Sequence, residues 1–80
     1  MALKLVFLGR LEDAAGSAER EVAAQPSIDA VLATLEADLA EALRADKVKI
    51  AVNGVLIHDH DAPILKDGDE VAFLPPVSGG

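Results

Sequence analysis

The residues with the clearest chemical use stand at the end of the chain, where Val77-Ser78-Gly79-Gly80 follows Phe73-Leu74-Pro75-Pro76. Proline restricts φ and lacks an amide donor, so the two prolines should hold the chain extended as it leaves the body of the protein. Glycine has no Cβ, so the two glycines fit a channel that excludes every other residue. The pattern predicts a thin arm that presents an α-carboxylate, and the alternative is an ordinary frayed terminus.

A carboxylate is a poor electrophile at neutral pH and needs activation, which ATP-dependent adenylation provides. A sulfur donor can then displace AMP and leave a thiocarboxylate, which is a good nucleophile. The sequence has no phosphate-binding loop and no catalytic dyad, so if the tail is used, a separate protein must activate Gly80. We therefore expect a carrier that is not an enzyme on its own. Fully extended, the residues after Pro76 span roughly 13 Å, enough to enter a buried site in a partner.

In a second cluster, His58-Asp59-His60-Asp61, imidazoles alternate with carboxylates, and the imidazoles could bind a metal ion. These are the only two histidines in the chain, and nothing in the sequence identifies residues that would orient them as ligands. We interpret the cluster as a solvated loop between two strands and expect no metal site.

Composition narrows the class of protein. The chain has 80 residues, of which 51% are hydrophobic, so it should form one small domain. The absence of cysteine excludes disulfides and thiolate chemistry. A net charge of −7 argues against nucleic acid and anionic membranes as partners, and fits a partner with a basic face. The apolar N-terminal run is too short for a signal peptide, and no segment reaches membrane-spanning length, so we expect a soluble cytoplasmic protein. We also expect no permanently bound cofactor.

Hydrophobic patterning predicts the elements that position the tail. Strands are expected over residues 3–8, 17–24, 48–52, 55–57 and 70–74. Ser27 should cap one helix, and the lack of glycine and proline favours its continuity to about Leu43, with an interruption at Ala37-Asp38 as the open alternative. The segment between Gly9 and Gly16 is expected to be a loop with at most one helical turn. Asn53-Gly54 and residues 66–69 are tight-turn signals.

The predicted fold class is α+β, with one main helix packed on one face of a mixed sheet. The first and last strands carry large apolar residues on both faces, so they should be neighbours in the centre. Strand, strand, helix, strand, short strand and strand is the order of a β-grasp, the ubiquitin-like architecture. We expect a β-grasp domain over residues 1–76 and a flexible Gly-Gly tail over residues 77–80.

The alternation of the central strands predicts a second functional feature. Leu3, Leu5, Phe7, Val71 and Phe73 should face the helix, so that Val6, Leu8, Ala72 and Leu74 face away, with Leu56 beside them. A sheet covered on one side should have a polar outer face, so a contiguous apolar patch there would mark a protein interface. The alternative is that loops cover it.

These residues resemble a known family, the small sulfur-carrier subunit of molybdopterin synthase. The resemblance is specific over residues 67–80, which end in Phe73-Leu74-Pro75-Pro76-Val77-Ser78-Gly79-Gly80. Looser matches are Lys4 to Phe7, Ala15-Gly16 and Ala51-Val52-Asn53-Gly54. The resemblance covers nearly the whole chain and is weakest between Ala18 and Lys47.

The resemblance implies a β-grasp fold and a working C-terminal glycine. An ATP-dependent adenylyltransferase related to ubiquitin-activating (E1-like) enzymes would adenylate Gly80, which then receives sulfur as a thiocarboxylate. The tail would enter the large catalytic subunit and donate sulfur to cyclic pyranopterin monophosphate, building the dithiolene of molybdopterin. The complex would be a heterotetramer of two small and two large subunits.

Carried over by position, the resemblance makes Gly80 the thiocarboxylate site and Gly79 its slim neighbour. Leu8, Leu56 and Leu74 match the family's apolar contact patch, and residues 75–77 lead from it to the tail. The residues implied in partner binding are Leu8, Leu56, Leu74, Pro75, Pro76 and Val77. Two patch positions hold aromatic residues in some relatives, so the patch should be smaller here.

Three other functions stay open at this point. A sulfur carrier of thiazole synthesis also resembles a β-grasp that ends in Gly-Gly, but such tails usually lack the double proline. A ubiquitin-like modifier would be joined to lysines through Gly80. A binding module would not use its tail at all, and would work without Gly79 and Gly80.

Overall fold

The structure, a computed structural model, describes residues 2–45, 48–57 and 64–75. Over these residues the chain forms three short helices and a mixed five-stranded sheet in the order β2-β1-β5-β3-β4. The strands are β1 (Ala2–Phe7), β2 (Glu19–Ala23), β3 (Lys49–Val52), β4 (Val55–Ile57) and β5 (Glu70–Leu74). The helices are α1 (Arg10–Ala15), α2 (Ile28–Ala33) and α3 (Ala37–Leu43). The predicted α+β class and β-grasp order are confirmed, and none of the described helices is long and apolar enough to cross a membrane.

The first and last strands lie next to each other in the sheet, as predicted. β1 pairs in parallel with β5, and the two outer pairs, β1 with β2 and β3 with β4, are antiparallel hairpins. β5 also pairs antiparallel with β3, so it has a strand on each side. The chain therefore leaves the sheet from a strand that is paired along both edges.

The turn between β3 and β4 also holds the start of β5. Asn53 and Gly54 have φ values of 52° and 82°, which suit the type I′ turn of a two-residue hairpin. The Asn53 side chain accepts a hydrogen bond from the Glu70 amide at 2.9 Å and donates to Asp69 at 3.0 Å. The bond from Asn53, followed by one from the Lys66 amide, lowers the pKa of Asp69. This network joins the turn between β3 and β4 to the start of β5.

Two helices, α2 and α3, occupy the stretch for which one helix up to Leu43 was predicted, so that prediction was wrong. Ser27 does cap α2, because its Oγ accepts a hydrogen bond from the Ala30 amide at 3.1 Å. The helix then stops at Thr34, whose hydroxyl donates to the Val31 carbonyl at 2.7 Å, and Glu36 has an extended ψ of 143° before α3 begins. The break therefore lies between Thr34 and Glu36, a stretch without glycine or proline.

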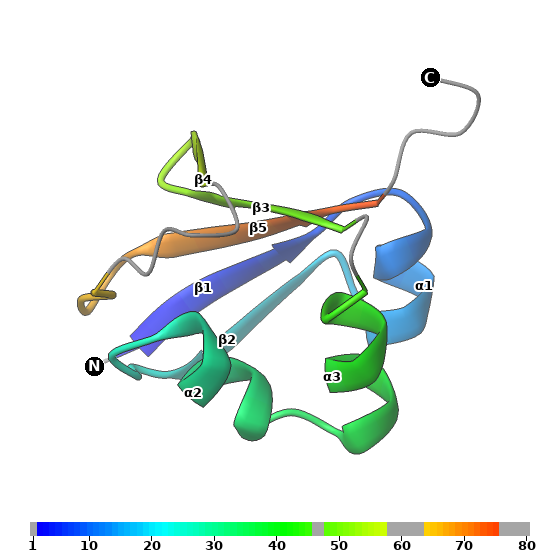
Figure 1. The fold of residues 1–80 in the computed structure, drawn as a ribbon, viewed down its shortest axis with the longest axis horizontal. Coiled ribbons are helices and arrows are strands. Elements are labelled where there is room, and N and C mark those ends of the chain that lie inside the picture. Colours follow the sequence, from blue (N-terminus) through cyan, green and yellow to red (C-terminus); the bar gives the residue numbers. More distant parts are fainter. Residues whose placement is uncertain (1, 46–47, 58–63, 76–80) are drawn as a thin grey trace.

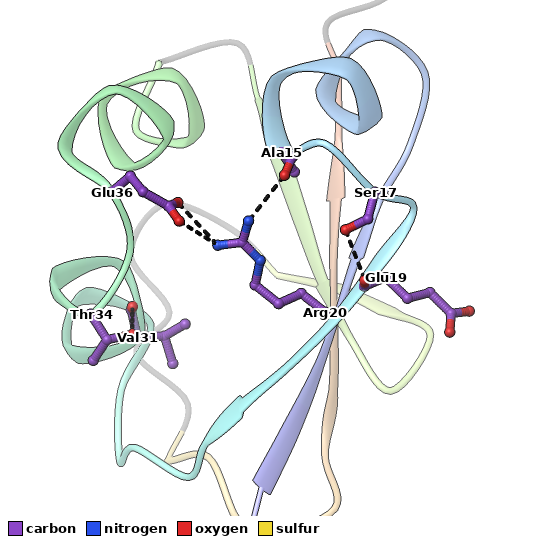
Figure 2. Close-up of polar contacts among 7 residues, drawn as sticks. All are labelled: Ala15, Ser17, Glu19, Arg20, Val31, Thr34 and Glu36. Carbon is purple, nitrogen blue, oxygen red and sulfur yellow. Dashed lines mark hydrogen bonds and ion pairs between the residues drawn. The ribbon is translucent and has the colours of Figure 1, made fainter.

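Arg20 of β2 contacts the residue at the end of this break, Glu36. Its guanidinium donates to both carboxylate oxygens of Glu36, at 3.2 and 3.0 Å, and to the Ala15 carbonyl at the end of α1, at 3.0 Å (Figure 2). The bond from Arg20 lowers the pKa of Glu36. One strand side chain thus joins the end of α1 to the connection between α2 and α3.

The segment from Gly9 to Gly16, expected to be a loop with one helical turn, forms a helix, α1. Leu11 and Ala15, one helical turn apart, are both buried. Gly16 ends the helix in the left-handed conformation, with φ at 82°, and its amide donates to the Glu12 carbonyl at 2.9 Å. Two apolar residues were too weak a pattern to predict a helix from the sequence.

The core lies between the helices and one face of the sheet, and the helices are gathered on one side (Figure 1). The strand residues expected to face the helix are all buried, at 0–1% exposure, namely Leu3, Leu5, Phe7, Val71 and Phe73. The rings of Phe7 and Phe73, paired across β1 and β5, stack with centroids 5.7 Å apart. The predicted inward face is therefore confirmed.

The ends of β1 and β5 remain in contact beyond the strands. The Leu8 amide donates to the Phe73 carbonyl at 3.1 Å. Gly9 then adopts φ 56° and ψ −134°, a region that residues with a Cβ rarely occupy. A Cβ on Gly9 would lie 2.9 Å from Cγ of Pro75. Pro75 therefore packs directly against the Gly9 backbone, and we call this contact, together with Leu8 and Leu74, the tail root.

Replacing Gly9 with alanine should destabilise the fold and displace Pro75. The backbone strain costs about 1–3 kcal/mol, and the close contact with Pro75 adds to it. Urea unfolding of Gly9→Ala measures the loss. Gly16→Ala is the reference, because Gly16 also has a positive φ but lies in the more accessible left-handed helical region and has open space around its Cβ position. Gly9→Ala should lose more stability than Gly16→Ala, and equal losses would contradict this.

Candidate docking face and tail root

The face of the sheet turned away from the helices carries a continuous row of apolar side chains. Val6 of β1 lies opposite Ala72 of β5, Ala72 lies opposite Ala51 of β3, and Ala51 lies opposite Leu56 of β4. Side chains at paired positions point to the same face of a sheet. In β1, β5 and β3 the residues on either side of the row are buried in the core or pack against it. The row therefore crosses four strands without a polar residue.

Leu8 and Leu74 extend this row towards the tail. We define the outer apolar patch as the four row residues and these two leucines, that is, Val6, Leu8, Ala51, Leu56, Ala72 and Leu74. Leu8 is 42% exposed and Leu56 is 50% exposed, whereas Leu74 is half-buried. The predicted outward orientation is confirmed for Leu8 and Leu74. Exposed leucines gathered on one face are typical of a protein interface.

Beside the outer apolar patch, the outer face carries a charged region around Lys4. Lys4 of β1 lies between two carboxylates, with its Nζ 3.4 Å from Glu19 and 3.8 Å from Glu70. Glu21, which pairs with Lys4 across the β1–β2 hairpin, adds a third acidic side chain. Ion pairs this exposed contribute little to stability. The outer face therefore carries an apolar region across β1, β5, β3 and β4 and an acidic region around Lys4, with Glu19 directly opposite Val6 of the patch.

The structure places part of the predicted site and leaves the rest outside its described residues. Leu8, Leu56 and Leu74 share the outer face, and Pro75 lies at the tail root against Gly9. Residues 76–80, which include Pro76, Val77, Gly79 and Gly80, lie outside the described residues, as does the cluster at residues 58–61. Within the described ranges, no group of histidines, cysteines and acidic residues is arranged to hold a metal ion.

Sequence reasoning missed one residue of the site, Gly9. Its role depends on contact with Pro75, a residue distant in the sequence, so no local pattern indicates it. A glycine placed directly after a strand was the available signal, and it was interpreted only as the start of a loop.

The side chains of the outer apolar patch have no chemistry of their own, because all six are aliphatic. Such a surface can exclude water and bind another apolar surface, but it cannot transfer a group. The patch is therefore a candidate docking face next to the point where the chain leaves the sheet.

The sequence and the fold both match known proteins. The model of the ThiS family matches residues 5–80. The molybdopterin synthase sulfur carrier subunit of Escherichia coli is 40% identical over 82 residues, which cover 98% of this chain and 99% of that protein.

Two solved structures share the fold at high similarity. Small archaeal modifier protein 1 from Methanosarcina acetivorans has a TM-score of 0.78 at 29% identity, covering 99% of this chain and 96% of that one. A protein–protein complex of subunits 1 and 2 of the molybdopterin-converting factor from Helicobacter pylori contains a chain with a TM-score of 0.69 and 29% identity, and the match covers both chains completely.

The family match spans almost the whole chain, and the identity with the Escherichia coli carrier extends over nearly its full length. This chain therefore belongs to the ThiS family of ubiquitin-like β-grasp proteins and is a relative of the molybdopterin synthase sulfur carrier subunits.

Proposed function

We propose that this chain is the sulfur-carrier subunit of a molybdopterin synthase and has no catalytic activity on its own. The observation that carries the proposal is the position of the outer apolar patch, which includes Leu74 at the end of β5 and reaches the tail root. A protein that delivers its own terminus needs a docking face close to where that terminus leaves the body. The identity with the Escherichia coli sulfur carrier subunit supports the specific function.

The proposed chemistry belongs to the α-carboxylate of Gly80. A carboxylate oxygen attacks the α-phosphate of ATP on an E1-like adenylyltransferase, and pyrophosphate leaves. A sulfur donor then attacks the acyl carbon, AMP leaves with the oxygen, and the product is a thiocarboxylate. Each thiocarboxylate transfers one sulfur to cyclic pyranopterin monophosphate, so two of them are needed for the dithiolene of molybdopterin. Hydrolysis then returns Gly80 to a carboxylate. ATP is bound by the activating enzyme, and this chain holds no permanent cofactor.

The proposed partner for sulfur transfer is the large subunit of the synthase. The Helicobacter pylori chain that matches this fold is part of a complex of two subunits of a molybdopterin-converting factor. In our proposal the outer apolar patch docks on the large subunit while residues 77–80, which span roughly 13 Å when extended, enter its active site. Two small and two large subunits would form the complex.

The first test measures the mass of the C-terminal peptide. Incubating the protein with its activating enzyme, ATP and a sulfur source should exchange one oxygen for sulfur at Gly80. Mass spectrometry of the intact protein and of its C-terminal peptide detects the exchange. A variant that lacks Gly79 and Gly80 should keep the same unfolding midpoint and show no exchange. An unmodified peptide, in a sample whose terminus is intact, would rule out the carrier function.

The second test introduces a charge into the docking face. Leu74→Glu should weaken binding to the large subunit about tenfold or more, because docking would bury a carboxylate without a partner. Val55→Glu is the matched control, since Val55 is 67% exposed and lies outside the outer apolar patch. Calorimetric titration of the large subunit with each variant gives the affinities. Unchanged binding by Leu74→Glu would place the interface elsewhere.

A second candidate function is that of a ubiquitin-like protein modifier, joined to lysines through Gly80. The observation that favours it is the fold similarity to small archaeal modifier protein 1. Isopeptide-linked adducts of this chain in cell extracts, absent for the variant without Gly79 and Gly80, would support it. The sulfur carrier of thiazole synthesis is less well supported, because such tails usually lack the Pro75-Pro76 pair found here.

A further inference from the structure

We propose that Lys49 and Arg10 form a basic rim at the tail root and pair with carboxylates of the large subunit around the entrance to its active site. This inference rests on the proposed function, and it adds two positive charges to the outer apolar patch. Four observations support it: the position of Lys49, the ion pairs of the other cations, the position of Arg10 and the charge of the remaining surface.

Lys49 lies beside the tail on the docking face. It is the first residue of β3 and pairs directly with Leu74, so both side chains point to the outer face. Ile50 and Phe73, the next pair, point to the core side. Lys49 is exposed. Its aliphatic stem can cover part of the apolar surface next to Leu74, while its ammonium reaches the edge of the patch.

Most other cations of the described residues form ion pairs with carboxylates, whereas Lys49 and Arg10 do not. Lys4 pairs with Glu19 and Glu70, Arg20 pairs with Glu36, and Arg44 pairs with Asp29. Within the described part of the chain, neither Lys49 nor Arg10 has an acidic partner within ion-pair distance. The chain has twice as many acidic residues as basic ones, and these two exposed cations near the tail root are unpaired among the residues that the structure describes.

Arg10 lies on the other side of the tail root. It begins α1 directly after Gly9, the residue against which Pro75 packs, and its side chain is exposed. Figure 1 shows the start of α1 next to the end of β5. The two cations therefore come from different elements, α1 and β3, that both lie beside the end of β5.

Burial of the docking face specifies the partner's chemistry. When the large subunit covers Leu74, water is removed from around the neighbouring Lys49 ammonium, and a desolvated charge without a partner is costly. The large subunit should therefore supply a carboxylate at that point. The acidic region around Lys4, with Glu19, Glu21 and Glu70, would repel such carboxylates, so the two charged regions favour one docking orientation.

The test compares charge variants of this chain in binding to the large subunit. Lys49→Glu should weaken binding about tenfold and Lys49→Gln about threefold, because the first adds repulsion and the second only removes attraction. Arg10→Gln combined with Lys49→Gln should weaken binding further than Lys49→Gln alone. The effects should shrink between about 0.05 M and about 0.5 M salt, as expected for screened charges.

Lys66→Glu is the matched control, because it changes the net charge equally but lies before the turn at the opposite end of β5. Thermal unfolding of every variant shows whether the fold is intact. If Lys49→Glu binds as tightly as Lys66→Glu, the basic rim does not exist. If the unaltered chain fails to bind the large subunit at all, the proposed function fails instead, so the two results are distinguishable.

Discussion

The parallel pairing of β1 with β5 is the constraint on which the rest of the structure depends. Two paired parallel strands finish at the same end of the sheet, so the residues that follow β1 and those that follow β5 must lie close together there. Phe7 and Phe73 stack at this position, and beyond them Leu8 bonds to the Phe73 carbonyl and Gly9 accommodates Pro75. The chain therefore leaves the sheet at a fixed point with a buried aromatic pair beneath it.

The same pairing determines what each face of the sheet can do. The core face of β1 and β5 is filled by the helices, and Arg20 ties α1 to the connection between α2 and α3. The outer face is left with aliphatic residues near the tail root and with charged residues around Lys4. The sheet thus has its core on one face and the candidate docking surface on the other.

Much of this arrangement follows from local sequence patterns, and the rest does not. Alternation along Leu3 to Leu8 and along residues 70–74 predicted which side chains point to the core, because strand geometry is periodic. The Asn53-Gly54 turn was equally local. The break between Thr34 and Glu36 is contacted by Arg20 of a different element, and Gly9 is contacted by Pro75, so neither arrangement could be found from neighbouring residues. The non-local contacts are the ones that shape the tail root.

The central claim is that the outer face at the tail root, and not the helical face, contacts the large subunit. Methyl NMR of the labelled protein, titrated with unlabelled large subunit, tests this most directly. The account predicts that the methyl signals of Leu8, Leu56 and Leu74 shift or broaden, while those of Ile28 and Leu35 in the helical layer stay unchanged. Changes confined to the helical layer, with the three outer leucines unaffected, would contradict it.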